Sequence, residues 1–283
     1  MSSMQSNDEQ GQSVSAFLPS TDGQMIAQVR VPGGRVRAPQ WEALADLSDE
    51  FGRGELRLSS TSSLHIPGVE DTGTLSTRLN DHGLAGTTVP AIMCSPLLPG
   101  LGELVDALVA TLPSNGTVFG IDAGDGAIIA KQPDFALLAA ETAGSFHLVV
   151  SGQPTGLLIS RDDAVEALTT VVTHGNTPPT VGSHLDGLIQ GHCEPILPPA
   201  PSRPAPIGWI QNGDHVTLGA GLRDGQLDSR LARFLAAIET DIWITPWNSL
   251  VIHGLSDGVA DQVVKVLAPM GLIFDANSPW LHD

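Results

Sequence analysis

Cysteine is nearly absent from this 283-residue chain, which contains only Cys94 and Cys193. The two residues lie in separate parts of the sequence. They cannot form a dense disulfide framework or provide the four thiolates that usually hold an iron–sulfur cluster. Because cysteine use this sparse fits a reducing compartment, we expect a cytoplasmic protein.

Cations are also scarce, with 13 lysines and arginines against 31 aspartates and glutamates and a formal net charge of −18. Such a charge repels nucleic acid and anionic lipid at long range, so we expect no nucleic-acid partner. The few cations are unevenly placed. Six arginines fall between residues 30 and 78, namely Arg30, Arg35, Arg37, Arg53, Arg57 and Arg78. An anion-binding site, if the protein has one, is therefore predicted in this stretch.

Long apolar runs are missing too. The longest stretches, such as residues 146–150 and 263–272, are broken well before the roughly 18 residues that cross a bilayer, so no membrane segment is predicted. Residues 1–20 are mostly polar and have neither the cationic start nor the apolar run of a signal peptide. These residues are predicted to be a disordered tail. A hydrophobic content of 41% nevertheless indicates a globular protein with a core.

An internal repeat organises the sequence. Residues 55–69 align with residues 241–255 at a constant offset of 186, with apolar residues and a glycine at matching places. A helical pattern precedes each copy, another helix follows it, and a strand-like stretch comes before the first helix. Each copy is thus predicted to fold as strand, helix, strand, strand, helix, which begins a ferredoxin-like α+β unit.

The remaining sequence separates the two copies. We predict a first ferredoxin-like half at residues 21–98, an α/β insert at 99–193, a proline-rich and semi-rigid linker at 194–207, and a second half at 208–283. The predicted fold class is α+β, with the two halves paired by a pseudo-twofold axis and the α/β insert domain between them.

This arrangement resembles the nitrite/sulfite reductase superfamily. Strings that favour its precorrin-3B synthase branch are Val29-Arg-Val-Pro-Gly-Gly-Arg-Val36, Gly54-Glu-Leu-Arg-Leu58, Ser95-Pro96-Leu97 and Ile244-Thr-Pro-Trp247. The resemblance implies an oxidoreductase component of cobalamin biosynthesis that acts on a tetrapyrrole. It further implies a 4Fe-4S cluster together with sirohaem or iron as cofactors.

The sequence departs from this family pattern in three respects, one of which is the lack of a basic residue after Leu112-Pro113 in the insert. The family's cluster-bearing lobe, with four cysteines, would follow the second half, and this sequence stops at Asp283. We therefore expect this chain to hold no cofactor by itself and to depend on a separate cluster-bearing subunit or on a homodimer. The family also places arginines in the turns of the repeat, where this sequence has Thr61 and Asn248. Two alternatives stay open: a non-catalytic tetrapyrrole-binding or scaffold protein, and an inactive truncated homologue.

Several residues are candidates for holding a tetrapyrrole carboxylate or another anion. Arginines around a Pro-Gly-Gly turn could form a cationic rim, and Arg57 points away from its two leucine neighbours on a predicted strand. The alternative interpretation is a strand end with solvated charges and two ordinary hairpin turns. The full candidate set is Arg30, Arg35, Arg37, Arg57, Thr61, Ser63 and Asn248. We assign no catalytic residue and expect no metal site.

Overall fold

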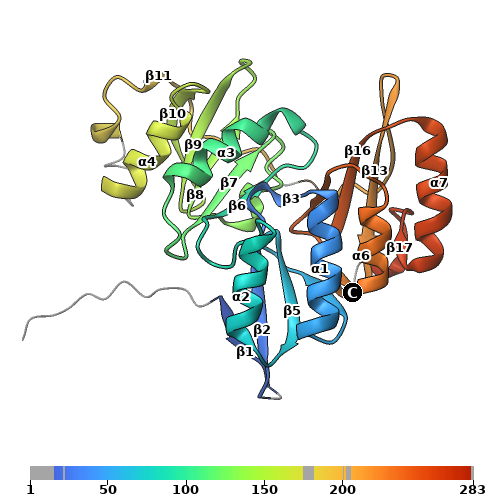
Figure 1. Cartoon of the computed structure of the whole chain (residues 1–283). Helices are drawn as coiled ribbons and strands as arrows, with labels where there is room; N and C mark the ends of the chain where they lie inside the picture. The colour runs from blue at the N-terminus through green and yellow to red at the C-terminus, as the bar shows by residue number, and fades with distance from the viewer. Residues whose placement is uncertain (1–15, 22, 175–181, 200, 202–204, 282–283) are drawn as a thin grey trace, which may run out of the picture.

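The computed structural model describes residues 16–281 except residues 22, 175–181, 200 and 202–204. Three sheets and the helices packed on them form a mixed α+β fold, which confirms the predicted fold class (Figure 1). Two of the sheets are built by the repeat and the third by the insert. In the described part of the chain, every helix is too short or too polar to cross a membrane.

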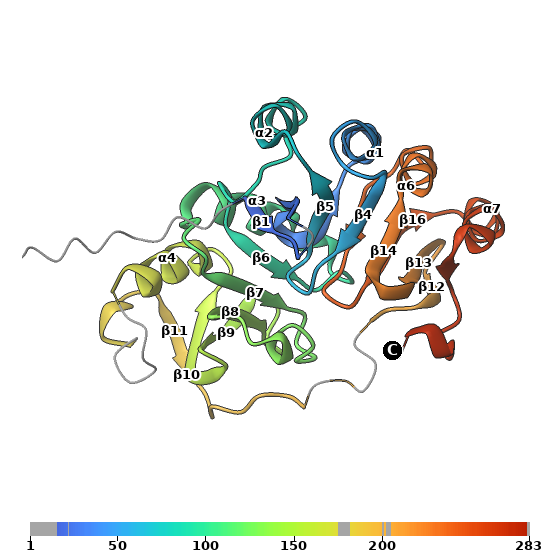
Figure 2. The same ribbon diagram turned by 90° about the horizontal axis from the view of Figure 1, so that it is seen from below.

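The two halves share the order strand, strand, helix, strand, strand, helix, and the second half has a further strand at each end. The first half comprises β2 (Met25–Arg30), β3 (Arg35–Val36), α1 (Ala38–Phe51), β4 (Glu55–Leu58), β5 (Ser63–Val69) and α2 (Thr72–Asp81). The second half comprises β12 (Gly208–Asn212), β13 (His215–Leu222), β14 (Gln226–Asp228), α6 (Ser229–Ala236), β15 (Ile242–Ile244), β16 (Ser249–Leu255), α7 (Asp257–Leu267) and β17 (Leu272–Ile273). Figure 2 shows α1, α2, α6 and α7 together on one face of the two sheets.

The N-terminal end differs from the predicted tail. Residues 1–15 lie outside the described residues, but Phe17–Pro19 form β1, which pairs with β2. Phe17 packs against the hydrophobic core, and the carbonyl of Ala16 accepts a 2.8 Å hydrogen bond from the backbone N–H of Gln28. Packing and ladder hydrogen bonds together hold this short edge strand in place despite its polar surroundings in the sequence.

The halves exchange strands. The first sheet has the order β1-β2-β5-β4-β14, and the second has the order β12-β13-β16-β15-β3. Strand β14 of the second half therefore closes the first sheet, with Gln226 opposite Arg57. Strand β3 of the first half closes the second sheet, with Arg35 opposite Trp243. Neither sheet is complete without the other half, so the two halves form one unit.

A tight glycine turn precedes each exchanged strand. Gly34 has a φ of +78°, and a Cβ at this residue would lie 2.2 Å from the carbonyl oxygen of Ile244 in the other half. Gly225 has a φ of +64°, and a Cβ there would lie 3.4 Å from the carbonyl oxygen of Leu58. Leu58 and Ile244 occupy equivalent places in the repeat. Glycine is thus required for the close backbone approach at Gly34.

One hydrophobic core runs through both halves. Trp41, Leu44 and Leu47 repeat at helical spacing along α1 and are at most 1% exposed. Helices α1 and α6 lie side by side (Figure 1). Across their exposed side, the Arg233 guanidinium donates 2.8 Å hydrogen bonds to Asp46 and Asp49. Apolar burial provides most of the pairing energy, because exposed ion pairs contribute little.

The insert has its own sheet and core. Its elements are β6 (Ala91–Cys94), α3 (Gly102–Thr111), β7 (Val118–Asp122), β8 (Phe135–Ala139), β9 (Ser145–Val150), β10 (Gln153–Ser160), α4 (Ala164–His174) and β11 (Ile189–His192). Strands β6, β7 and β8 are parallel, and β9, β10 and β11 extend the sheet antiparallel. Strand β6 lies ahead of residue 99, where the sequence analysis places the start of the insert. Residues 200 and 202–204 of the predicted linker lie outside the described residues.

A buried carboxylate organises the loop after β7. The Asp122 side chain is completely buried and accepts four backbone hydrogen bonds of 2.8–3.1 Å, from Gly124, Gly126, Ile128 and Ile129. These N–H groups replace water around the carboxylate. The loop leads directly to Lys131, whose ammonium lies 5.8 Å from the ring centroid of Trp247 in the second half. Asp122 therefore positions a contact between the insert and the second half.

Candidate functional site

The face of the first sheet opposite the helices carries a polar row. Gln28 pairs with His65, His65 pairs with Arg57, and Arg57 pairs with Gln226, so four cross-strand neighbours lie in line. Leu56 precedes Arg57 and is fully buried, whereas the Arg57 side chain is 47% exposed. This alternation places Arg57 on the face away from the helices, as its leucine neighbours predict. Because of the strand exchange, both halves contribute to the row.

Arg57 is held by a neighbouring carboxylate. Its Nε donates a 2.6 Å hydrogen bond to Glu55, and this bond raises the pKa of the guanidinium. Beside it, burial lowers the pKa of His65, and the charge of Arg57 lowers it further. The Nε2 atom of His65 is buried and has no hydrogen-bond partner among the described residues. The row thus offers a permanent cation and a neutral imidazole side by side.

Two half-buried histidines make stability depend on pH. Burial lowers the pKa of both His65 and His253, the second of which donates a 2.7 Å hydrogen bond to the carbonyl of Pro96 in the insert. A histidine with a lowered folded-state pKa takes up its proton more readily when unfolded, so stability is lost as the pH falls below about 6.5.

We therefore expect the urea midpoint to fall between about pH 7.5 and 5.5. His65→Gln should reduce that fall, because it removes one of the two groups. The matched control is His82→Gln, at the exposed end of α2, which should leave the slope unchanged. Equal slopes in wild type and His65→Gln would contradict the assignment.

The predicted turn residues form two matching hydroxyl turns. In the β4–β5 turn, the Ser59 hydroxyl oxygen accepts from the backbone N–H of Thr61 at 3.3 Å and of Ser63 at 3.2 Å. In the β15–β16 turn, the hydroxyl oxygens of Thr245 and Ser249 lie 2.6 Å apart. The hydroxyl oxygens of Thr61 and Ser63 are themselves 3.4 Å apart. The hydroxyl groups of these side chains therefore already have hydrogen-bond partners within the turns. A ligand would have to be bound in addition to these contacts.

Asn248 occupies a strained turn position. Its φ is +52°, and Ser62 at the equivalent place in the first half has a φ of +54°. Asparagine tolerates this conformation better than most residues. Its exposed side chain lies close to Gly225, where a Cβ would come within 2.7 Å of the Asn248 amide oxygen. The left-handed backbone of the turn explains why asparagine occupies this position. The side-chain amide of Asn248 lies near Gly225, directly before the exchanged strand β14.

The other three predicted arginines gather elsewhere. Arg30, Arg35 and Arg37 line one pocket of about 400 Å³, whereas Arg57 is not among its lining residues. The pocket lies where the first half meets α3 of the insert. Among the seven candidate residues, the structure thus brings Arg30, Arg35 and Arg37 into a single pocket. The remaining four belong to the strand face and its hairpin turns.

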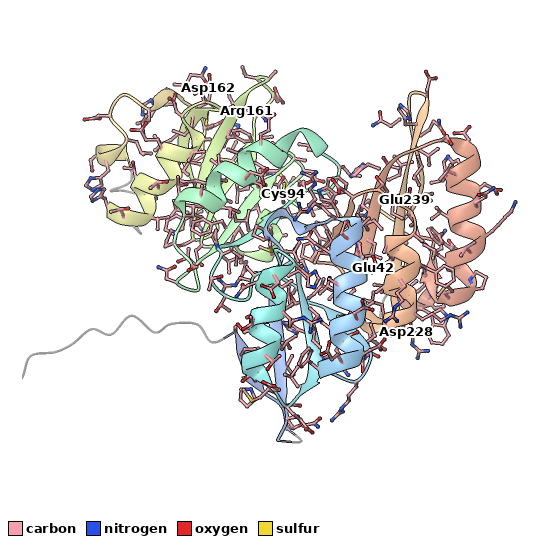
Figure 3. All side chains as sticks on the ribbon, viewed as in Figure 1. Glu42, Cys94, Arg161, Asp162, Asp228 and Glu239 are labelled. Atoms are coloured by element: carbon pink, nitrogen blue, oxygen red, sulfur yellow. The ribbon has the colours of Figure 1, made fainter. Side chains whose placement is uncertain are left out.

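Neither cysteine is placed to bind a cluster. Cys94 is buried where the insert meets the two halves (Figure 3), and burial raises the pKa of its thiol to about 12. Cys193 lies on the far part of the insert, where its sulfur is 3.1 Å from Nδ1 of His147. Within the described residues, no three histidines, cysteines or acids come together as a metal site. Two separate thiols do not fit a 4Fe-4S cluster, which needs four.

The chain is similar to a known domain family, to a known protein and to a solved structure. The nitrite/sulfite reductase ferredoxin-like half domain matches residues 18–79, which span the first half. The sulfite reductase [NADPH] subunit beta of Saccharomyces cerevisiae is 33% identical over 93 residues, or 33% of this chain and 6% of that protein. The NirA protein of Mycobacterium tuberculosis superposes with a TM-score of 0.74 at 17% identity, covering 89% of this chain and 58% of NirA.

These matches define the class of fold. The chain contains a region similar to the nitrite/sulfite reductase ferredoxin-like half domain, and its overall fold is like that of NirA. The matched part amounts to 58% of NirA and 6% of the yeast subunit. The predicted resemblance to the superfamily is confirmed at this level. The precorrin-3B synthase branch stays a prediction.

Two parts of the site have no local signal in the sequence. Gln226 joins the polar row only through strand exchange, and a three-residue strand has no periodicity to reveal it. The pocket wall from α3 was missed because long-range packing brings Val105 and Val109 to the arginines. The short connection at residues 59–62 could have pointed to His65 as the neighbour of Arg57, because loop length fixes the register of a hairpin.

Proposed function

We propose that this chain is the tetrapyrrole-binding platform of a sulfite/nitrite-reductase-like oxidoreductase, of the precorrin-3B synthase type that acts in cobalamin biosynthesis. The observation that carries the proposal is the polar row on the strand face, with an exposed arginine beside a neutral buried histidine and amides from both halves. This face offers one exposed guanidinium, which a carboxylate of a planar macrocycle can engage in place of Glu55.

Each residue of the row has a distinct chemical part. Arg57 can hold a ligand carboxylate by two parallel N–H bonds, in exchange for its present contact with Glu55. The amide groups of Gln28 and Gln226 can donate or accept further hydrogen bonds, whereas Nε2 of His65 is buried and does not reach a ligand. Thr61, Ser63 and Asn248 stand at the two hairpin ends. These three residues would contact the edge of the ligand at the hairpin ends.

Redox chemistry requires more than these residues. A 4Fe-4S cluster would supply electrons and an iron tetrapyrrole would bind oxygen or an oxyanion, but Cys94 and Cys193 do not fit the cluster. We therefore assign no electron-transfer step to this chain. We propose that residues outside these 283 provide the cluster, either on a separate cluster-bearing subunit or through another assembly such as a homodimer.

Arg57→Ala tests the proposal by equilibrium titration with sirohaem, followed by its absorption spectrum. A charged hydrogen-bond pair contributes roughly 1.5–3 kcal/mol, so the variant should bind at least about tenfold more weakly. Arg78→Ala is the matched control, because Arg78 is a similarly exposed arginine on α2 that pairs with Glu50. The control should bind as wild type. Failure of wild type to change the sirohaem spectrum would reject the proposal.

A non-catalytic binding or scaffold role is the second candidate, and the shortage of thiolates favours it. The two roles differ in turnover. With dioxygen and a chemical reductant supplied, a catalytic platform should convert a bound precorrin once the cluster-bearing partner is added. Tight precorrin binding with no conversion under those conditions would support the scaffold role.

A further inference from the structure

A buried arginine without a counter-ion lies at the junction of the first half and the insert. Arg30 is 6% exposed, and its Nη1 donates hydrogen bonds to the carbonyls of Val89 at 2.7 Å and Thr87 at 3.3 Å. Its Nε is buried and has no partner among the described residues, where the side chain also forms no ion pair. A buried charge in this state is costly, and burial lowers the pKa of the guanidinium.

Two further arginines face the same pocket. Arg37 precedes α1 and is exposed, with its Nε 3.3 Å from the Gln40 side-chain oxygen, and it forms no ion pair in the described part of the chain. Arg35 is paired with Asp241, its Nη2 lying 2.5 Å from the carboxylate. One acid, Asp106, also lines the pocket. The three arginines carry three positive charges, and Asp106 and Asp241 carry two negative ones. The pocket therefore has a net positive charge, although the net charge of the chain is −18.

The remaining wall of the pocket is apolar. Pro32, Val89, Val105 and Val109 also line the pocket. Its volume of about 400 Å³ exceeds what a lone inorganic anion fills and falls within the range of small-molecule sites. Arginine forks match phosphate oxygens in bidentate fashion, and the start of α1 adds backbone dipoles that favour a dianion.

We propose that this pocket binds a small organic phosphate, with its phosphate group on Arg30, Arg35 and Arg37 and its apolar body against Val105 and Val109. The ligand compensates the buried charge of Arg30 and bridges the first half to the insert. This site is independent of the polar row, since Arg57 does not line it.

Isothermal titration calorimetry at low salt tests the pocket with two probes, phenyl phosphate and inorganic phosphate. We expect phenyl phosphate to bind with a Kd below about 1 mM and at least about fivefold more tightly than inorganic phosphate. Equal affinity for the two probes would overturn the assignment of an apolar body. No heat from either probe at about 5 mM would overturn the site itself.

Variants locate the binding. Arg37→Ala removes an exposed guanidinium with only one side-chain contact, so folding should persist while phenyl phosphate binding weakens about tenfold or more. Val109→Glu, on the half-buried wall, places a carboxylate against the apolar body of an anionic ligand and should abolish binding. Arg230→Ala on α6 is the control and should bind as wild type. Unchanged binding in both pocket variants, with thermal unfolding as in wild type, would overturn the proposed location.

Discussion

Gly34→Ala is expected to lower the free energy of unfolding by about 3 kcal/mol or more. The added Cβ would lie 2.2 Å from the carbonyl oxygen of Ile244, so the exchanged strand β3 would have to move away from β15. The left-handed φ of +78° adds a further penalty of about 1 kcal/mol for an L side chain. Urea unfolding measured by far-UV circular dichroism gives the change.

Two other glycines separate the causes. Gly254→Ala introduces a side chain at a φ of +73° with nothing within 4 Å, so it should cost only the conformational penalty of about 1 kcal/mol. Gly258→Ala lies within α7, also with nothing within 4 Å, and should be neutral or slightly stabilising. If Gly34→Ala lowered the free energy of unfolding no more than Gly254→Ala does, the two halves would not approach each other closely at Ile244.

Asp122→Ala is expected to destabilise the insert by about 4 kcal/mol. Four backbone N–H groups, from Gly124 to Ile129, would lose their acceptor inside the protein, and each unsatisfied buried donor costs about 1–3 kcal/mol before water enters. The loop would also release Lys131 from the ring of Trp247. Limited proteolysis should therefore cut the 123–131 segment faster in the variant, and calorimetry should show a lower transition for the insert.

Asp134→Ala provides the matched comparison in the same insert. Its exposed carboxylate accepts a single 2.8 Å hydrogen bond from the backbone N–H of Val118, so its loss should cost about 1 kcal/mol. An equal loss of unfolding free energy in the two variants would contradict the assignment, because it would show that the four hydrogen bonds to Asp122 stabilise the insert no more than the single bond to Asp134.

The repeat made most of the fold predictable from the sequence. Segments of seven or more residues, such as β5 and α1, have a clear period, and the offset of 186 ties the two halves together. Strands β3 and β14 have only two and three residues, too few to show any period. Their exchange between sheets is fixed by long-range pairing, which local sequence does not encode.

The candidate site was predictable only in part. Alternation with Leu56 and Leu58 places Arg57 on the correct face, because strand geometry is local. The same reasoning could not show that Arg30 is buried, since the loop that covers it, with the carbonyls of Thr87 and Val89, lies far along the chain. Composition concentrated the arginines in one segment, whereas packing divided them between a pocket and a sheet face.

Hydrogen–deuterium exchange with and without sirohaem tests the proposed tetrapyrrole face most directly. Saturating sirohaem should slow amide exchange in residues 55–69, which include Arg57 and His65, and in the turn at 245–249, while α2 on the opposite face stays unchanged. Sirohaem binding that leaves residues 55–69 unprotected would contradict a tetrapyrrole site on this strand face.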